Sequence, residues 1–258
     1  MGRQLNFHQR YVLLLEPIQA PSGETIAWEL LTRFTHRDGT VRQLPANDPH
    51  QPFIGMLAAE KWQLFLLQLE QIAALYQNGF SCITSLNIDI DIIHGILKNE
   101  TVQQKLDRLP FLRLEISAFF TERYHARDRL LLQNLAAMTP ALLWLDDFGA
   151  GSSTLSMLNS GIFEYVKTDK TFFQKYGEAY LFDTLLNHLN ELCHGVIVQG
   201  VDTPIQRAAL AGKKITGMQG DQWHRCNLSD FTESLIISHS AKPLKTQRDT
   251  ATHYRHFL

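Results

Sequence analysis

Short apolar runs alternate with longer segments of helical periodicity along almost the whole chain, and this alternation constrains the fold more than any other feature of the sequence. Apolar residues recur at helical spacing over residues 53–76 and again over 128–138. The apolar run Leu142–Leu145, which follows the second of these segments, is too short for a helix. Strands and helices that alternate in this way build parallel sheets. Because the 258 residues contain no long linker, we expect an α/β fold with one TIM-like (β/α)8 barrel, and an open doubly wound sheet is the alternative.

The periodicities place each expected element. The strands are expected at residues 11–15, 25–34, 81–87, 111–116, 141–146, 165–167, 195–199 and 215–219. The helices are expected at residues 53–76, 90–97, 102–106, 128–138, from 153 onward, 171–192, 204–211 and 228–238. We expect three regions: an N-terminal extension over residues 1–10, the barrel domain over 11–240, and a polar C-terminal tail over 241–258. Trp28, Trp62 and Trp144 are expected to pack between the barrel and its helices.

Acidic and amide side chains stand at or near the ends of the expected strands. They are Glu29, Asn87, Glu115, the adjacent pair Asp146 and Asp147, Gln199 and Gln219, and Lys167 ends a further strand. The C-terminal ends of barrel strands meet at one face, so these side chains are expected to lie together there. An Asp-Asp-Phe-Gly segment by itself could equally be a helix cap followed by a solvated acid. Caps do not explain so many oxygen ligands and a lysine from separate strands, so the sequence favours a functional cluster.

The predicted cluster contains oxygen ligands and no thiolate, and such ligands favour Mg²⁺ or Mn²⁺ over structural zinc. Two such ions about 4 Å apart, bridged by a shared carboxylate, are a standard device for hydrolysing a phosphodiester. Asp146 is the natural bridge, because Asp147 beside it can occupy the second ion. The first ion would be completed by Glu29, Asn87 and Glu115. Lys167 would hold the attacking water or offset the charge that develops on the phosphate.

The composition argues against several other classes of function. The formal net charge is −2, so no basic field suits the phosphates of duplex nucleic acid. The three cysteines are far apart and odd in number, which fits neither a zinc-binding pair nor a disulfide framework. The sequence shows no membrane-spanning stretch and no signal peptide. We therefore expect a cytoplasmic protein that binds neither duplex nucleic acid nor a membrane.

Several ordered motifs contain these polar residues. They are Glu29-Leu30-Leu31-Thr32-Arg33, Leu86-Asn87-Ile88, Leu114-Glu115-Ile116-Ser117, Asp146-Asp147-Phe148-Gly149-Ala150-Gly151, Lys167-Thr168-Asp169-Lys170-Thr171-Phe172 and Met218-Gln219-Gly220. In this order they resemble the motifs of the EAL domain family, which hydrolyses cyclic di-GMP to the linear dinucleotide pGpG on a barrel with a reversed first strand. The resemblance extends from Tyr11 to Ser238.

The resemblance implies a role for each of these residues. The implied metal ligands are Glu29, Asn87, Glu115, Asp146 and Asp147, and the implied catalytic residues are Glu29, Lys167 and Gln199. The implied substrate-binding residues are Arg33, Asp169 and Gln219, with Arg33 on a phosphate and Gln219 facing the second ion or the guanine. The implied cofactors are two Mg²⁺ or Mn²⁺ ions, of which the second is the weaker.

Three positions depart from the family pattern. Gln199 replaces a glutamate that helps to bind the second ion and has been assigned a role as base. An amide oxygen can ligate a cation, but it carries no charge and accepts no proton near neutral pH. Ala118 replaces a glutamate that braces the loop over the active site, so this loop and a homodimer lose a supporting contact. The segment Asp221-Gln222-Trp223-His224 also differs, which alters the guanine end of the pocket.

Three functions are consistent with these observations, and a metal-dependent cyclic di-GMP phosphodiesterase, weakened by Gln199, is the primary prediction. The second is a protein that binds cyclic di-GMP through Arg33 and the pocket without turning it over. The third is a protein with a vestigial site that controls motility or fimbriae through a regulatory protein partner. The intact ligand positions favour the first two over the third, and Gln199 favours the second over the first.

Overall fold

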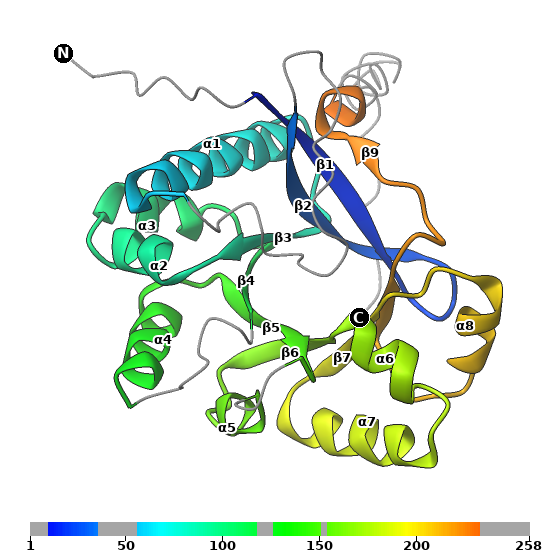
Figure 1. Ribbon diagram of the computed structural model, residues 1–258. Coiled ribbons are helices and arrows are strands. Elements are labelled where there is room, and N and C mark those ends of the chain that lie inside the picture. Colours follow the sequence, from blue (N-terminus) through cyan, green and yellow to red (C-terminus); the bar gives the residue numbers. More distant parts are fainter. Residues whose placement is uncertain (1–9, 36–55, 118–125, 151–153, 233–258) are drawn as a thin grey trace, which may run out of the picture.

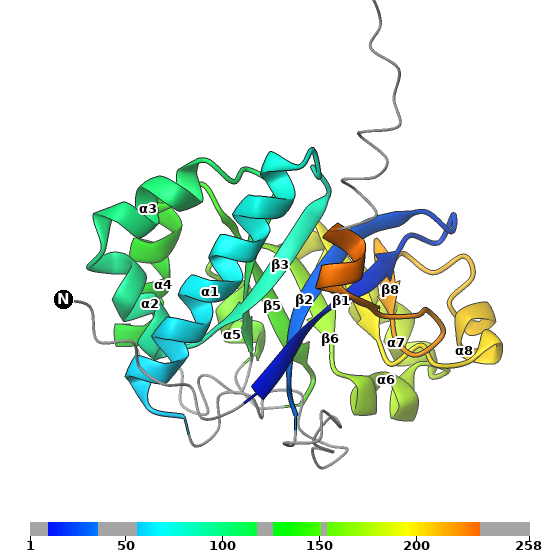
Figure 2. The ribbon, with the colours of Figure 1, turned by 90° about the horizontal axis from the view of Figure 1, so that it is seen from above.

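The computed structural model describes residues 10–35, 56–117, 126–150 and 154–232, and these residues form a closed barrel of strands surrounded by helices (Figures 1 and 2). The predicted TIM-like α/β barrel is confirmed. The barrel strands are β1 (Arg10–Gln19), β2 (Thr25–Thr35), β3 (Ile83–Ile88), β4 (Leu112–Ser117), β5 (Leu142–Phe148), β6 (Phe163–Thr168), β7 (Gly195–Gln199) and β8 (Gly217–Gln219).

The first strand runs opposite to its neighbours, as the family resemblance implies. β1 and β2 form an antiparallel hairpin, and every later pair from β2–β3 to β7–β8 is parallel. The barrel closes where β8 returns to β1, through one residue pair between Gln19 and Met218. A two-residue strand, β9 (Cys226–Asn227), pairs with β1 at Leu14 and Leu15. The closure therefore has little backbone pairing at this point.

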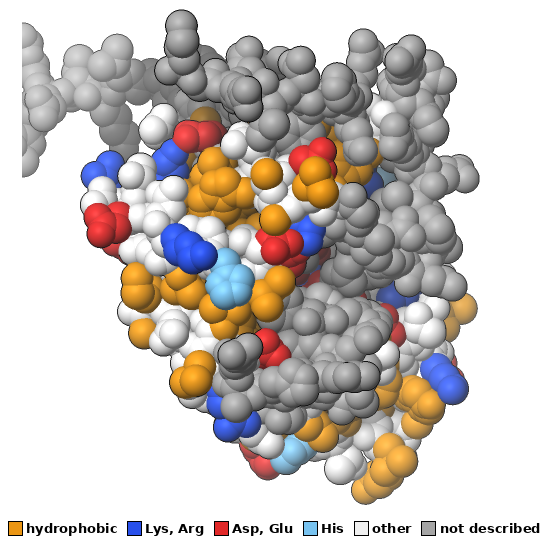
Figure 3. All heavy atoms as spheres, turned by 60° about the vertical axis from the view of Figure 1, so that its left-hand side comes forward, with side chains coloured by type: hydrophobic (Ala, Val, Ile, Leu, Met, Phe, Trp, Pro, Cys, Tyr) orange, Lys and Arg blue, Asp and Glu red, His pale blue; other side chains and the backbone are white. Residues whose placement is uncertain are grey.

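Helices surround the barrel in the order expected for alternating strands and helices. They are α1 (Ala58–Gln77), α2 (Ile90–Leu97), α3 (Glu100–Asp107), α4 (Ala126–Met138), α5 (Thr154–Leu158), α6 (Lys170–Tyr176), α7 (Tyr180–Leu192) and α8 (Pro204–Ala209). On the side that carries α1 to α4, hydrophobic side chains lie in several groups separated by charged and neutral ones (Figure 3). Such scattered exposure is normal for a protein surface.

The single helix predicted over residues 171–192 is wrong, because the structure divides this segment into α6 and α7. Gly177 ends α6, and its amide donates to the carbonyl of Phe173. A Cβ at Gly177 would lie 2.5 Å from the Phe173 ring, so a larger residue at this position would have to displace that ring. Ala179 is extended at φ −73° and ψ 141°, and α7 then begins in a new direction.

Side chains alternate along each strand between the outer core, against the helices, and the barrel interior. Outward residues such as Leu86, Leu114 and Val166 join the large core that the helices cover. The lower interior is a smaller apolar cluster that contains Ile18, Ala27, Trp144 and Ile197. The prediction that Trp144 packs between barrel and helices is therefore wrong: Trp144 fills the barrel itself.

Glu164 closes this apolar layer from below with a polar network. The register between β5 and β6 shifts beside it, so Glu164 is an extra residue in β6. Its carboxylate accepts hydrogen bonds from Trp144 Nε1 at 2.8 Å and from Arg113 Nε at 2.6 Å. The indole N–H and the guanidinium are thus satisfied, and the interior above them is left for the residues at the C-terminal ends of the strands.

Candidate functional site

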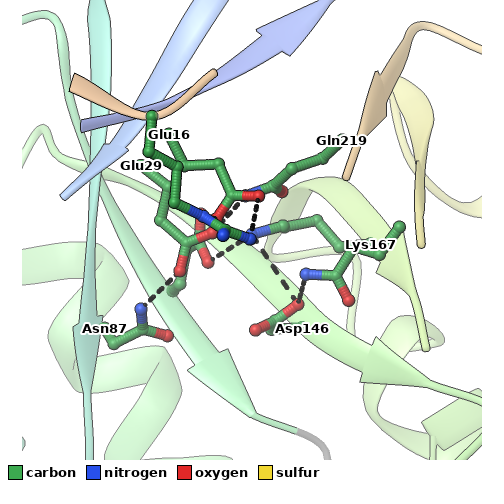
Figure 4. A network of polar contacts seen from close by, with 9 residues as sticks. Glu16, Glu29, Asn87, Asp146, Lys167 and Gln219 are labelled. Carbon is green, nitrogen blue, oxygen red and sulfur yellow. Dashed lines mark hydrogen bonds and ion pairs between the residues drawn. The ribbon is translucent and has the colours of Figure 1, made fainter. Parts of the chain in front are cut away.

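One polar side chain from each of seven neighbouring strands faces the barrel interior near its C-terminal end. In strand order they are Glu29, Asn87, Glu115, Asp146, Lys167, Gln199 and Gln219. The registers explain the grouping, because Asn87 pairs with Glu115 and Gln199 pairs with Gln219 in adjacent strands. Directly paired residues of neighbouring strands point to the same face of the sheet. Figure 4 shows Glu29, Asn87, Asp146, Lys167 and Gln219 converging from separate strands.

Lys167 lies at the centre of the cluster and is fully buried. Its Nζ donates to Glu29 Oε2 at 2.7 Å and to Glu115 Oε2 at 2.8 Å, and it lies 3.8 Å from Asp146 Oδ1. Burial lowers the pKa of a lysine, but the charges of Asp146, Glu115 and Glu29 raise the pKa of Lys167 well above its usual value. Lys167 is therefore a permanent cation that holds three strands together.

Three amides supply the remaining hydrogen bonds to the carboxylates. Asn87 Nδ2 donates to Glu29 Oε1 at 2.7 Å, and Gln219 Nε2 donates to Glu29 Oε2 at 2.7 Å. Gln199 Nε2 donates to Asp146 Oδ1 at 2.9 Å. In the arrangement described, the amides act as donors, and Glu29 is the carboxylate that receives most of them.

The two buried glutamates that share Lys167 differ in their pKa. Burial raises the pKa of Glu29, but the charge and hydrogen bond of Lys167, with those of the two amides, bring it down to about 2. Burial and the charge of Glu29 raise the pKa of Glu115 to about 8, against the opposing effect of Lys167. Of these two glutamates, Glu115 is therefore the one that takes up a proton first.

Asp147 has a strained backbone beside this cluster. Its φ is 57°, a left-handed conformation that non-glycine residues rarely adopt. Ser117 Oγ donates to its carboxylate at 2.9 Å, while burial and the charge of Asp146 raise its pKa well above the usual value. Gly149 follows at φ 102° with the Phe172 ring directly against it. The chain thus makes a tight turn over Asp147–Ala150, where the Ala150 amide donates to the Asp147 carbonyl at 3.2 Å. Strain of this kind often marks functional sites.

Arg33 and Asp169, two of the predicted substrate-binding residues, differ in the hydrogen bonds that they make. Arg33 Nη1 donates to the carbonyl of Thr32 at 3.2 Å, which is the one hydrogen bond that its guanidinium makes within the described residues. The other N–H donors of this half-buried cation remain available to an anion. Asp169 caps α6, because its Oδ1 accepts from Phe172 N at 2.7 Å. A substrate contact of Asp169 remains a prediction.

Glu16 and Arg225 are site residues that the sequence analysis missed. Glu16 pairs with Glu29 across β1 and β2, so its carboxylate faces the same interior. Arg225 binds it through Nε at 2.8 Å and Nη2 at 3.0 Å. The segment Pro21-Ser22-Gly23-Glu24 contains the necessary signal, since a hairpin folded about a turn at these residues brings residue 16 opposite residue 29.

The oxygen ligands fit a hard divalent cation by their chemistry. Glu115 Oε1 and Gln219 Oε1 are buried without a hydrogen-bond partner among the described residues, so both have an acceptor to offer. Over that same part of the chain, no three His, Cys, Asp or Glu side chains are already arranged to hold a metal ion. The ammonium of Lys167 lies between Glu29 and Glu115, two of the carboxylates that would ligate a metal ion.

The segment that follows Gln219 lies against the barrel. Trp223 is half-buried and packs against the core, and the amide of Asp221 donates to Asp202 Oδ1 at 3.0 Å. Ala118 and the predicted C-terminal tail over 241–258 lie outside the described residues. None of the described helices combines the length and the apolar character needed to cross a membrane.

A closed barrel with a reversed first strand and a cluster of buried carboxylates at the C-terminal ends of its strands places this protein in the class of TIM-like barrels. The chain belongs to the EAL domain family, whose sequence profile matches residues 4–225.

Two relatives with similar sequences have different functions. The chain is 29% identical over 195 residues to the cyclic di-GMP phosphodiesterase PdeH of Escherichia coli, covering 73% of each chain. It is 27% identical over 224 residues to the putative anti-FlhC(2)FlhD(4) factor YdiV of the same organism, covering 84% of this chain and 91% of YdiV.

Two solved structures confirm the fold. The crystal structure of the EAL-like protein YdiV superposes with a TM-score of 0.72 at 24% identity, over 88% of this chain and 97% of that one. The phosphodiesterase PaMucR in complex with c-di-GMP superposes with a TM-score of 0.66 at 21% identity, over 86% and 94% of the two chains.

Proposed function

We propose that this protein binds cyclic di-GMP at the mouth of its barrel and hydrolyses it far more slowly than a homologue with glutamate at position 199 would. The observation that carries the proposal is the hydrogen bond from Gln199 Nε2 to Asp146 Oδ1. The amide occupies Asp146 with a donor, where a carboxylate would offer a charged ligand and a proton acceptor.

Binding is supported by the unused hydrogen-bonding capacity at the mouth. Arg33 has N–H donors without partners within the described residues. Gln219 Oε1 is a buried acceptor that also has no hydrogen-bond partner among these residues. A cyclic dinucleotide carries phosphates for the guanidinium and base edges for the amide. The complex of PaMucR with c-di-GMP shows that a barrel of this fold accepts such a ligand.

Slow turnover follows from the chemistry of the amide. A positioned general base contributes about 10²–10⁴-fold to a rate, and an amide cannot replace it near neutral pH. Loss of one carboxylate also weakens any second metal ion. Both effects act on the chemical step, so ligand binding is affected less than hydrolysis.

The residues that would hold one Mg²⁺ or Mn²⁺ ion are Glu29, Asn87, Glu115 and Asp146, with Asp147 available to a second ion. Such an ion would polarise the phosphate and lower the pKa of a bound water. The ammonium of Lys167 would compete with it for the carboxylates of Glu29 and Glu115. Glu115 has to be deprotonated, and its raised pKa opposes this below about pH 8.

Titration calorimetry with cyclic di-GMP, together with an assay for pGpG in Mg²⁺ or Mn²⁺, tests the proposal. We expect binding by the wild type, weaker binding by Arg33→Ala, and little product. Rapid formation of pGpG by the wild type would show that the protein is an efficient phosphodiesterase. Absence of binding in the presence and absence of metal would refute the binding function.

A regulatory protein partner is the second candidate. It is supported by the likeness to YdiV, which extends over 97% of the YdiV structure. Purified FlhC(2)FlhD(4) complex is the appropriate probe, with binding measured by size-exclusion chromatography. A stable complex that forms equally with Arg33→Ala would favour this function over ligand binding.

A further inference from the structure

Two buried glutamates stand directly opposite each other at the barrel mouth. Glu16 on β1 pairs with Glu29 on β2 in an antiparallel register, and both carboxylates face the interior. Like charges in this relationship destabilise a sheet. The structure resolves the conflict by giving each glutamate its own cation, since Arg225 binds Glu16 and Lys167 binds Glu29.

Arg225 is well placed for this role. It directly precedes Cys226, which pairs with Leu15 of β1, so the same antiparallel register brings Arg225 beside Glu16. Both contacts to Glu16 are charge-assisted, and Arg225 Nη2 lies a further 3.0 Å from Asp221 Oδ1. The Glu16 side chain is 7% exposed and the Arg225 side chain 38%, so the pair extends from the buried interior to solvent.

Arg225 also lies close enough to Arg33 for its charge to affect that residue. The pKa of Arg33 is lowered first by burial and then by the charge of Arg225, while Glu29 and Glu16 oppose this. The charges of Arg225, Glu29 and Glu16 therefore all act on Arg33. A change in any one of them alters the potential that a ligand meets at Arg33.

We propose that the Glu16–Arg225 pair sets the electrostatic preference of the barrel mouth between an anionic ligand and a free divalent cation. Where the anion is cyclic di-GMP, the proposal rests on the proposed function. Arg225 cancels the charge of Glu16 and leaves Arg33 to attract a phosphate. Without Arg225, the carboxylate of Glu16 adds to those of the Lys167 cluster, and the mouth attracts cations in place of phosphates.

Two substitutions change this charge in opposite directions. Arg225→Met leaves Glu16 unpaired, so we expect cyclic di-GMP to bind about three- to tenfold more weakly and Mn²⁺ to bind more tightly by a similar factor. Glu16→Gln leaves the cation, so we expect the reverse for both ligands. The double variant restores the net charge, and both affinities should return close to those of the wild type.

Titration calorimetry measures the two ligands separately, with cyclic di-GMP in EDTA and Mn²⁺ in the absence of nucleotide. Arg207→Met is the matched control, because Arg207 is an exposed arginine on α8 with no ion pair among the described residues. This control should change neither affinity. Thermal unfolding of each variant shows whether it is folded, and Glu16→Gln keeps the proposal testable if Arg225→Met does not fold.

Opposite changes in the two affinities are the expected result, because a loosened structure would weaken both. Parallel weakening of both ligands by Arg225→Met would overturn the proposal and make the pair a structural tie. If the wild type does not bind cyclic di-GMP, the proposed function fails. The Mn²⁺ titrations would then still decide whether the pair controls the charge of the mouth.

Discussion

Gln199 and Asp146 are joined across the barrel mouth by a hydrogen bond of 2.9 Å from the amide nitrogen to the carboxylate. Asp146 Oδ1 also lies 3.8 Å from Lys167 Nζ, so a neutral hydrogen-bond donor and a nearby positive charge both stabilise this carboxylate. An amide at this place stabilises the metal-free cluster, and under the proposed function it also lowers the rate of hydrolysis. The same bond thus connects the stability of the site with its low expected turnover.

Gln199→Glu is expected to increase hydrolysis of cyclic di-GMP in Mg²⁺ or Mn²⁺ by at least about tenfold, since it restores a proton acceptor and a charged ligand. In EDTA the same variant should be less stable than the wild type, because two carboxylates then face each other. The pGpG assay and denaturant unfolding measure the two effects.

Gln199→Ala is the control for this change, because it removes the hydrogen bond without adding a carboxylate. It should lose stability and gain no activity. Equal activity of the alanine and glutamate variants would show that the missing carboxylate does not limit the rate.

Lys167→Met is expected to lower the free energy of unfolding in EDTA by about 3–5 kcal/mol, since it leaves buried carboxylates without their cation. Mg²⁺ should recover much of this loss, because the ion then meets no competitor. Denaturant unfolding with and without Mg²⁺ measures both values. Lys213→Met, which breaks a more exposed pair with Asp183, should cost less than about 1 kcal/mol and respond little to the ion.

The stability of the metal-free protein is expected to fall as the pH rises from 4.5 to 8. The folded pKa of Glu115 is about 8 against an ordinary value of 4.5, so its contribution is complete below pH 4.5 and is lost as the pH passes 8. The raised pKa of Asp147 adds a change of the same sign. The pKa of Glu29, about 2, makes its contribution vary only at lower pH.

Denaturant unfolding in EDTA at several pH values measures this dependence. The slope should reach up to about 1.4 kcal/mol per pH unit for one proton. Glu115→Gln should flatten the curve. A wild-type curve that rises over this range would contradict the assignment of the proton to Glu115.

Gly149→Ala is expected to destabilise the fold by about 1–3 kcal/mol. Its φ is 102°, and a Cβ there would lie 2.5 Å from Phe172 Cγ. Gly161→Ala separates the two causes, because Gly161 has φ 69° and no atom within 4 Å of a Cβ. Thermal unfolding should show a smaller loss for Gly161→Ala, and equal losses would mean that backbone strain alone accounts for the effect.

The strand positions could be predicted because barrel strands leave a strong local pattern. Polar residues ended runs that were otherwise apolar, as at Asn87 and Glu115, and the parallel register then brings such residues together. This argument needs only sequence spacing and the rule that strand ends meet at one face. The family motifs supported the same positions independently.

The tertiary contacts of these residues could not be predicted in the same way. The central position of Lys167 depends on how far its side chain reaches between three strands. The division between α6 and α7 lies at the extended backbone of Ala179, a residue type that gives no signal for a helix break. Arg225 required knowledge of β9, a strand of two residues with almost no sequence signal.

The single residue pair between Gln19 and Met218 has a consequence for the order of folding. It joins positions about 200 residues apart, so the barrel closes only after nearly the whole chain has been synthesised. Glu29 and Gln219, which share a hydrogen bond, are brought together by the same step. Before it, β1 and β8 are exposed edges of an open sheet, and this interval is when the nascent chain is most vulnerable to aggregation and proteolysis.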